Sequence, residues 1–313
     1  MARSRGANAI MAFAFETTYG TPPGTGFRQV PFTSFNLGEE QNLLENDVLG
    51  FGREPLPPTF DVINNDGDCV VPVDVRNIGN WLKLLMGQPA DTTVSSDKQH
   101  VFTSGATVLP SASIEIGRPE VPSYGMNYGV RANTMRVSMQ RSGLLTATFG
   151  LVGQGETKTT TSSAGTLATT TIDRFSPFQG AVTRNGATLG NVVSGEFTYS
   201  NNLDKVEVIR GDGRIADADP GMVDVSGSIT VRFADTTLLD QAQANTPCAL
   251  QFGWAADVHR SLQIAIPAVY LPRAKQPITG PGGIQATFNW RASRDPVTGH
   301  AMTATLVNDV TTY

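Results

Sequence analysis

The stretch DGDCVVPVDVRNIGNWLKLLMG, residues 66–87, predicts a tight turn, a strand and a helix in direct succession. Its first part alternates apolar and other side chains, which is typical of a half-buried strand. Over residues 77–87 the apolar residues recur instead at i, i+3, i+4, i+7 and i+8, so the helix has an apolar stripe that packs on a sheet. Asp74 or Asn77 can cap this helix, and Gly87 can end it. The stripe consists of Ile78, Trp81, Leu82, Leu85 and Met86.

A similar succession occurs later in the chain, in SGSITVRFADTTLLDQAQAN, residues 226–245, where Asp235 takes the capping place of Asp74. Other segments match in the same order and place the single helix of each half at the same point. The matched segments are 30–37 with 176–200, 42–54 with 202–214, 66–74 with 226–235, 111–117 with 261–267, and 146–152 with 303–309. This ordered self-similarity predicts an internal duplication.

The remaining sequence reads mainly as strands and turns. A low-complexity segment, GQGETKTTTSSAGTLATTT at 153–171, cannot build a core, and we place the domain boundary there. The predicted organisation is a first domain at 1–155, a Gly/Ser/Thr-rich linker or loop at 156–172, and a second domain at 173–313. We therefore expect a mainly β protein of two tandem domains, each a β-sandwich or half-barrel with one flanking helix.

The composition limits the classes of function. The 313-residue chain carries a formal charge of −5 and 16% charged residues, which argues against a protein that grips nucleic acid through a basic surface. Cys69 and Cys248 lie in no CxxC pattern and are expected to be buried free thiols. No window approaches the length of about 20 apolar residues that spans a membrane, and the N-terminus does not read as a signal peptide. We expect a soluble protein kept in a cytoplasm.

The sequence offers no catalytic constellation. His100, His259 and His300 stand alone, without the spacing of metal ligands, and are interpreted as surface or hydrogen-bonded histidines. The glycine-rich stretches at 50–55 and 211–216 lack the third glycine of a phosphate loop. No GxSxG motif or Ser-His-Asp arrangement can be argued from spacing. We expect no enzyme, no cofactor and no metal site.

Each half contains a long segment between its first strand and its turn glycine, at 38–65 and 200–225. Isolated apolar residues in the first of these segments predict an arm that docks on a neighbouring subunit. The alternative is a long hairpin folded back on its own domain. The candidate docking residues are Leu43, Leu44, Val48, Leu49, Phe51, Arg53 and Pro55.

The stretch GREPLPPTFDVINNDGDCVVPVDVRNIGNWLKLLMGQP, residues 52–89, resembles one family of major tail tube proteins of long-tailed (siphovirus-type) bacteriophages. In that family an extended arm leads through a DGD and V-P-V-D pattern into a helix similar to GxWLKLLLG. The following PSASIEIGRP, residues 110–119, also fits the family. The resemblance covers most of the chain and is sharpest over 48–117.

The resemblance implies a tube-type fold in which strands of adjacent domains join edge to edge around a lumen. Rings of six domains stack coaxially in such tubes, and DNA passes through the lumen at ejection. Two domains per chain imply a trimeric ring with pseudo-sixfold symmetry. The implied partners are other copies of the chain and the tail terminator, distal tail and tape measure proteins, with no membrane. The implied location is the virion tail, after assembly in the host cytoplasm.

An acidic or neutral lumen would repel phosphate and let DNA slide. Strands with polar alternate positions are candidates for the lumen face, namely those with Arg136, Ser138, Gln140, Thr146, Thr148, Thr198 and Ser200. Three other functions compete with the tail tube. They are the inner tube of a contractile system, a β-sandwich binding module such as a capsid decoration protein or adhesin, and a hydrolase on a β scaffold.

Overall fold

The computed structural model describes residues 3–176, 179–278 and 280–313. Strands form 48% of the chain and helices 7%, which confirms the predicted mainly β fold class. The elements of the first part are η1 (Gly6–Asn8), β1 (Ile10–Phe15), β2 (Arg28–Gln29), β3 (Ser34–Phe35), β4 (Glu39–Leu44), β5 (Thr59–Pro72), α1 (Ile78–Met86), β6 (Ala90–Val94), β7 (Asp97–Thr103), β8 (Ala112–Arg118), β9 (Ser123–Gln140), β10 (Thr146–Val152) and β11 (Gly155–Thr159). They are followed by β12 (Gly180–Arg184), β13 (Ala187–Thr188), β14 (Val192–Ser200), β15 (Asp204–Val206), β16 (Asp217–Asp219), β17 (Asp224–Arg232), α2 (Thr237–Ala244), β18 (Cys248–Asp257), β19 (Arg260–Tyr270), β20 (Gln285–Ala292) and β21 (Thr303–Asn308).

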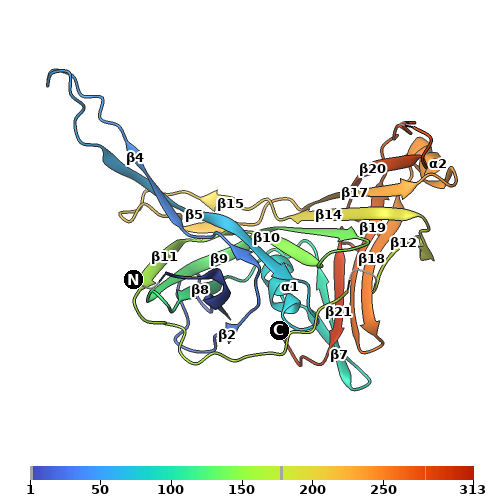
Figure 1. Ribbon diagram of the computed structural model, residues 1–313, viewed down its shortest axis with the longest axis horizontal. Helices are drawn as coiled ribbons and strands as arrows, with labels where there is room; N and C mark the ends of the chain where they lie inside the picture. Colours follow the sequence, from blue (N-terminus) through green and yellow to red (C-terminus); the bar gives the residue numbers. More distant parts are fainter. Residues whose placement is uncertain (1–2, 177–178, 279) are drawn as a thin grey trace.

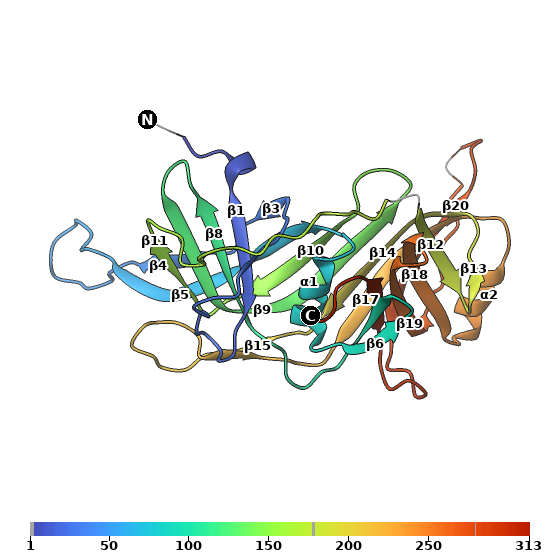
Figure 2. The same cartoon turned by 90° about the horizontal axis from the view of Figure 1, so that it is seen from below.

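Two groups of strands follow the same order of antiparallel pairing. In the first group β1, β8, β9, β10, β5 and β3 pair in that order, and β11 continues beyond β10 along β9. In the second group the order is β12, β18, β19, β20, β17 and β14, with β21 beyond β20 along β19. Each helix follows the same strand of its group, α1 after β5 and α2 after β17. The two groups lie side by side in an elongated molecule (Figures 1 and 2).

The two groups share an irregularity as well as an order. The register of β8 on β9 shifts between Ala112 and Ile114, and the register of β18 on β19 shifts between Cys248 and Leu250. A β-bulge bends its strand and increases the local twist, so a bulge at the same place gives the two groups the same curvature there.

The strands that correspond by pairing are not all those matched by sequence. The position of β10 in the first group is taken by β20, and not by the predicted segment 303–309. The position of β8 is taken by β18 instead of the predicted segment 261–267, which lies in β19. Alternating apolar residues indicate that a strand is half-buried but not which strand it pairs with. The two predicted matches, which relied on this pattern alone, are therefore wrong by one strand.

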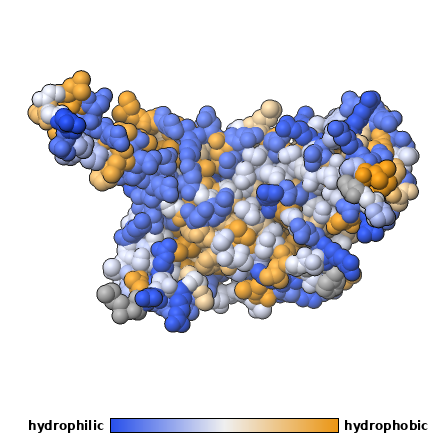
Figure 3. All heavy atoms as spheres, turned by 45° about the horizontal axis from the view of Figure 1, so that its top comes forward, coloured by the Kyte–Doolittle hydropathy of each residue, from blue (hydrophilic) through white to orange (hydrophobic). Residues whose placement is uncertain are grey.

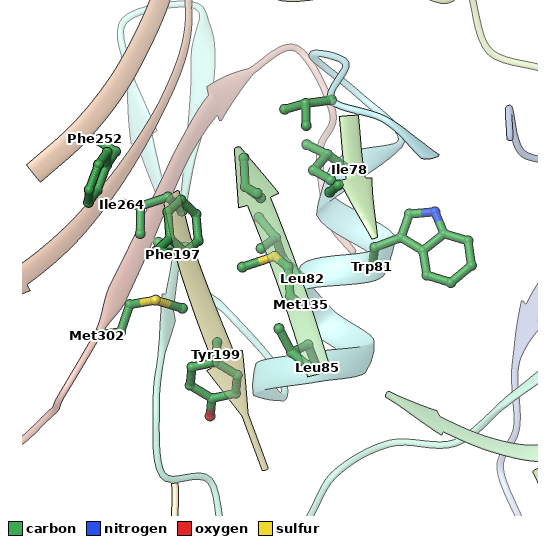
Figure 4. Close-up of a cluster of buried hydrophobic side chains, with 14 of the residues drawn as sticks. Ile78, Trp81, Leu82, Leu85, Met135, Phe197, Tyr199, Phe252, Ile264 and Met302 are labelled. Carbon is green, nitrogen blue, oxygen red and sulfur yellow. The ribbon is translucent and has the colours of Figure 1, made fainter. Parts of the chain in front are cut away.

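Helix α1 packs beneath the sheet through the predicted stripe. The exposed fractions of Ile78, Trp81, Leu82, Leu85 and Met86 are 2%, 1%, 1%, 0% and 2%. Leu82 and Leu85 point toward Met135 of β9 and toward Phe197 and Tyr199 of β14, whereas Trp81 points to the other side (Figure 4). The cap is Asp74, whose carboxylate accepts the backbone N–H of Asn77 and of Ile78, both at 3.0 Å. Gly87 ends the helix at φ +93°.

The main hydrophobic cluster contains residues of both groups. The strand groups join where β9 pairs with β14, and also where β7 of the first part pairs with β21. The buried amide of Asn201 donates to the carbonyl oxygens of Leu85 and Ala132, at 2.8 and 3.0 Å. Tyr313 lies against α1, where its backbone carbonyl oxygen accepts from Lys83 Nζ at 2.8 Å. The two groups are therefore fixed to each other by a common core.

The predicted linker at 156–172 begins inside strand β11, which pairs with residues 124–128 of β9. The rest of it is held to the first group, because Glu115 accepts from Ser162 Oγ at 2.5 Å and from the backbone N–H of Ser163 at 2.7 Å. Ala164 is buried. A Thr-rich sequence can pair as readily as it can form a loop, and the free edge of β9 decides the outcome here. The boundaries of the two domains stay a prediction.

The predicted states of the cysteines and histidines agree with the structure. Cys69 and Cys248 are buried and free, and burial raises the pKa of both thiols. His100 is buried, with its Nδ1 2.6 Å from Asp91 Oδ1. His259 contacts Asp97, and His300 Nδ1 lies 3.0 Å from the carbonyl oxygen of Ser104.

Candidate subunit interface

Strands β4 and β5 form a hairpin that projects from the body of the molecule, which we call the first arm (residues 39–65; Figure 1). The two strands pair from Glu39 opposite Asn65 to Leu44 opposite Thr59, and the tip spans residues 45–58. Hydrophobic side chains gather along the arm in the space-filling view (Figure 3, upper left). Leu49 at the tip is 90% exposed, and Phe51 is 71% exposed. Exposed apolar surfaces of this kind are typical of sites of protein interaction.

All the predicted docking residues lie on the exposed surface of the first arm. They are Leu43, Leu44, Val48, Leu49, Phe51, Arg53 and Pro55. The sequence reasoning missed Phe60 and Val62, which are exposed on β5 of the same arm. Their alternation in TFDVI resembles a half-buried strand, and only the projecting position of the hairpin leaves them uncovered.

The hairpin that includes β15 and β16 forms a second arm (residues 201–223), which lies along the first group of strands (Figure 1). Arg131 of β9 pairs with Asp217 at 2.9 Å and also donates to the carbonyl oxygen of Ala218. Ile215 and Ala218 pack on Val152 of β10 in a small apolar cluster. The second arm of the chain is thus docked on the neighbouring group of strands.

The loop at the tip of the second arm touches the base of the first arm. Arg214 of the second arm pairs with Glu39 of the first at 2.7 Å, and the hydrogen bond that Arg214 donates to Glu39 raises the pKa of Arg214. Beside this contact lies a groove of about 410 Å³ between the arms. Its lining includes Val62 and Ile63 of the first arm and Val208, Ile209 and Ile215 of the second. This groove and the first arm give the molecule an apolar surface at one end.

A family model for phage tail tube proteins matches residues 6–292 of the chain. The chain belongs to the phage tail tube protein family. No match was found among curated proteins. The family is one of structural proteins of the virion tail, which assemble into a tube with other tail proteins. The tail tube assignment agrees with the mainly β fold and does not favour a binding module.

The sheet of this tail tube protein has a polar face opposite α1. Arg136 of β9 lies directly opposite Thr148 of β10 on one side and Thr198 of β14 on the other, so the three side chains share this face. The other predicted lumen candidates lie two or four positions from these residues on the same strands, and therefore on the same face. They are Ser138, Gln140, Thr146 and Ser200. Arg136 pairs with Glu196 at 2.8 Å. The arginine at the centre of the polar face is therefore already neutralised.

Two further findings concern other kinds of site. None of the helices in the described part of the chain is long and apolar enough to cross a membrane. Among the described residues, no group of three or more His, Cys, Asp or Glu side chains is placed to hold a metal ion.

Replacement of Arg131 by Met is expected to loosen the second arm without unfolding the protein. The substitution keeps much of the side-chain volume but removes the ion pair with Asp217 and the bond to Ala218, and leaves that carbonyl oxygen without its donor. We expect hydrogen exchange at residues 203–219 to accelerate about 10-fold or more, a change that corresponds to roughly 1.5 kcal/mol. Exchange in β20 is the internal control. Unchanged exchange in the second arm would contradict this role of Arg131.

Proposed function

We propose that three copies of the chain close into a ring with pseudo-sixfold symmetry, and that such rings stack into the hollow tail tube of a long-tailed phage. The observation that carries the proposal is the junction of β9 with β14. It joins two groups of strands that have the same pairing order, the same bulge and a helix at the same place. A contact between equivalent units within one chain supports a repeat of that contact between chains, which closes a ring after six units.

The polar face of the sheet supports a role as the lumen wall. Six residues opposite one another on adjacent strands run across it, namely Val70, Thr148, Arg136, Thr198, Ser226 and Arg291. Basic side chains at this face form ion pairs with carboxylates. Arg136 pairs with Glu196 at 2.8 Å, and Lys205 pairs with Asp66 at 2.5 Å. A wall with paired charges offers few free cations to phosphate, so DNA passes through the tube during ejection without being held.

The first arm is proposed to dock on a neighbouring copy. The second arm supplies the precedent, because it lies on the adjacent group of strands and buries Ile215 and Ala218 there. The first arm carries more apolar side chains and extends beyond the body of the molecule (Figure 1). We infer that its tip reaches the next copy, and that the ends of the tube meet the tail terminator, distal tail and tape measure proteins.

Electron microscopy of the purified protein with native mass spectrometry tests the proposal. Hollow rings or tubes of sixfold appearance with a ring mass of three chains are the expected result. Rings of six chains would keep the tube and contradict the duplicated ring. Compact particles that form no rings at any concentration would overturn the tail tube assembly.

A further inference from the structure

The two groups of strands differ at one place that bears on assembly. In the first group, β9 continues as a strand to Gln140, and over residues 134–137 it has β10 on one edge and β14 on the other. In the second group, β19 ends at Tyr270, and residues 271–278 form no strand. A strand needs hydrogen-bonded neighbours. The segment after β19 lacks a partner equivalent to β14 within the described chain.

The stretch of chain that leads from β9 into β10 has the same length as the stretch that leads from β19 into β20. Val152 lies opposite Asp66 and Arg131, and Arg291 lies opposite Ser226 and Tyr270. Asp66 and Ser226 directly precede Gly67 of β5 and Gly227 of β17, so Arg131 corresponds to Tyr270. By the same pairing Thr146 corresponds to Gln285, and both intervals are 15 positions (146 − 131 and 285 − 270). Residues 134–139 therefore correspond to residues 273–278 without insertion.

The counterpart of β14 in the first group is the segment 34–40, which contains β3 and the start of β4. Both strands lie on β5 in one continuous register, with Phe35 opposite Cys69 and Glu39 opposite Asn65. Phe35 corresponds to Gly195 of β14, since Gly195 lies opposite Ile229 in β17. The edge of β14 that faces β9 corresponds to the outer edge of this segment. No strand of the described residues pairs with that outer edge.

We propose that residues 34–40 of one copy pair as an antiparallel strand with residues 273–278 of the next copy. This inference rests on the ring proposed above and names the strand pair that connects neighbouring copies, residues 34–40 with residues 273–278, which we call the joint. The junction within the chain fixes the register, because Ser200 lies opposite Thr134 and Tyr199 opposite Met135. When this register is applied to the corresponding residues of two copies, Glu40 lies opposite Arg273 and Glu39 lies opposite Ala274. Phe35 lies opposite Ile278.

The side chains at this joint complement one another. Glu40 is exposed and acidic, and it faces Arg273 with Lys275 two positions along the same strand. The junction within the chain contains an ion pair between diagonal neighbours of the same two strands, Arg136 and Glu196, at 2.8 Å. Ile278 is 77% exposed in the free chain and would be covered by Phe35. Opposite charges across a strand pair are favourable, and so is the burial of the apolar pair.

The proline in the segment is compatible with the pairing. Pro277 corresponds to Ser138, which lies opposite Glu196. The backbone N–H of Asn201 donates to the carbonyl oxygen of Asn133 at 2.8 Å, so the hydrogen-bonded pairs of this junction are the odd-numbered ones. The N–H of Ser138 therefore faces away from β14. A proline at the matching position removes no hydrogen bond from the joint.

Paired cysteine substitutions test the register. In the variant Glu40→Cys with Arg273→Cys, the two Cβ atoms of a directly opposite pair would lie about 4.5–5.5 Å apart, near the range of a disulfide. Strand β4, which contains residue 40, and strand β19, which residue 273 follows, lie on opposite sides of the molecule (Figure 1). A bond between residues 40 and 273 therefore joins two copies. The matched control is Glu40→Cys with Ile278→Cys, which is five positions out of register and about 17 Å away along the strand.

We expect oxidised rings of the first variant to give a covalent trimer in a non-reducing gel, with at least 10-fold more cross-linking than the control. Rings seen by electron microscopy that cross-link no better than the control would overturn the joint and leave the proposed function standing. Absence of rings in the unmodified protein would overturn both. Glu40→Arg and Arg273→Glu should each reduce ring formation about 10-fold, and the double exchange should restore it. Failure of the double exchange to restore rings would contradict the pairing of these charges.

Discussion

Deletion of residues 45–58 at the tip of the first arm, with a two-residue Asn-Gly turn in their place, is expected to abolish tube formation and to leave the protein folded. The deleted residues contact no part of the main hydrophobic cluster, and Val48, Leu49 and Phe51 are 55%, 90% and 71% exposed. Each large apolar side chain that a neighbouring copy covers fully would stabilise the assembly by about 1.5–3 kcal/mol. Loss of three such contacts is expected to lower the polymerised fraction by at least 100-fold, measured by sedimentation and electron microscopy.

Matched point substitutions separate the arm from a general effect of surface charge. Leu49→Asp on the arm and Val297→Asp in the turn before β21 both place a carboxylate at a position that is 90% exposed. We expect the first substitution to suppress tubes and the second to leave them intact, with the same melting temperature for both. Long tubes formed by the deletion variant would contradict the proposed docking of the first arm.

Replacement of Trp81 by Ala is expected to lower the free energy of unfolding by about 3–5 kcal/mol, the usual range for a large aromatic side chain in a core. Trp81 is 1% exposed and stacks on Phe149 of β10 with ring centroids 5.2 Å apart. Phe13 of β1 also packs on the indole, with ring centroids 5.5 Å apart. The indole therefore ties α1 to two strands of the first group, and its loss leaves a cavity between them. Urea unfolding of the isolated protein measures the change.

The conservative control is Trp81→Phe. The indole Nε1 is buried, and no acceptor for it lies within hydrogen-bond distance among the described residues. An unpaired buried N–H destabilises the folded state, so its removal offsets part of the lost packing. We expect Trp81→Phe to cost less than half as much as Trp81→Ala. Equal losses for the two variants would show that ring packing is not what Trp81 contributes.

Much of the architecture was predictable from local pattern. The 3.6-residue period over 78–86 predicted α1 and its buried stripe within one residue at each end. The tight turns predicted at Gly67 and Gly227 were wrong, because the structure places these glycines inside strands β5 and β17, opposite Leu151 and Trp290. Both glycines lie where a side chain has no room. A Cβ at Gly67 would come within 2.6 Å of the backbone of Leu37, and one at Gly227 within 2.1 Å of the carbonyl oxygen of Glu196. The exposed apolar residues of the first arm were also evident, because no periodicity assigned them to a core.

The candidate site was only partly predictable. Phe60 and Val62 alternate as core residues do, and Arg131 reads as an exposed charge in a strand. The structure leaves the first two exposed on a projecting hairpin and buries Arg131 against Asp217. In each case the decisive contact comes from a segment distant in sequence. Side-chain type predicts the preferred environment of a residue but not the segment that provides it.

The sequence by itself determined the mainly β class, the helix with its buried face and the apolar residues of the first arm, and it predicted two related halves. Only the tertiary structure decided which strands correspond, that β20 and not β21 takes the place of β10, and that β9 joins β14. The physical reason is that side-chain periodicity records which face of a strand is buried. The backbone hydrogen bonds at its edges are the same for nearly every residue, so the choice of partner depends on chain connection and on the packing of the complete sheet.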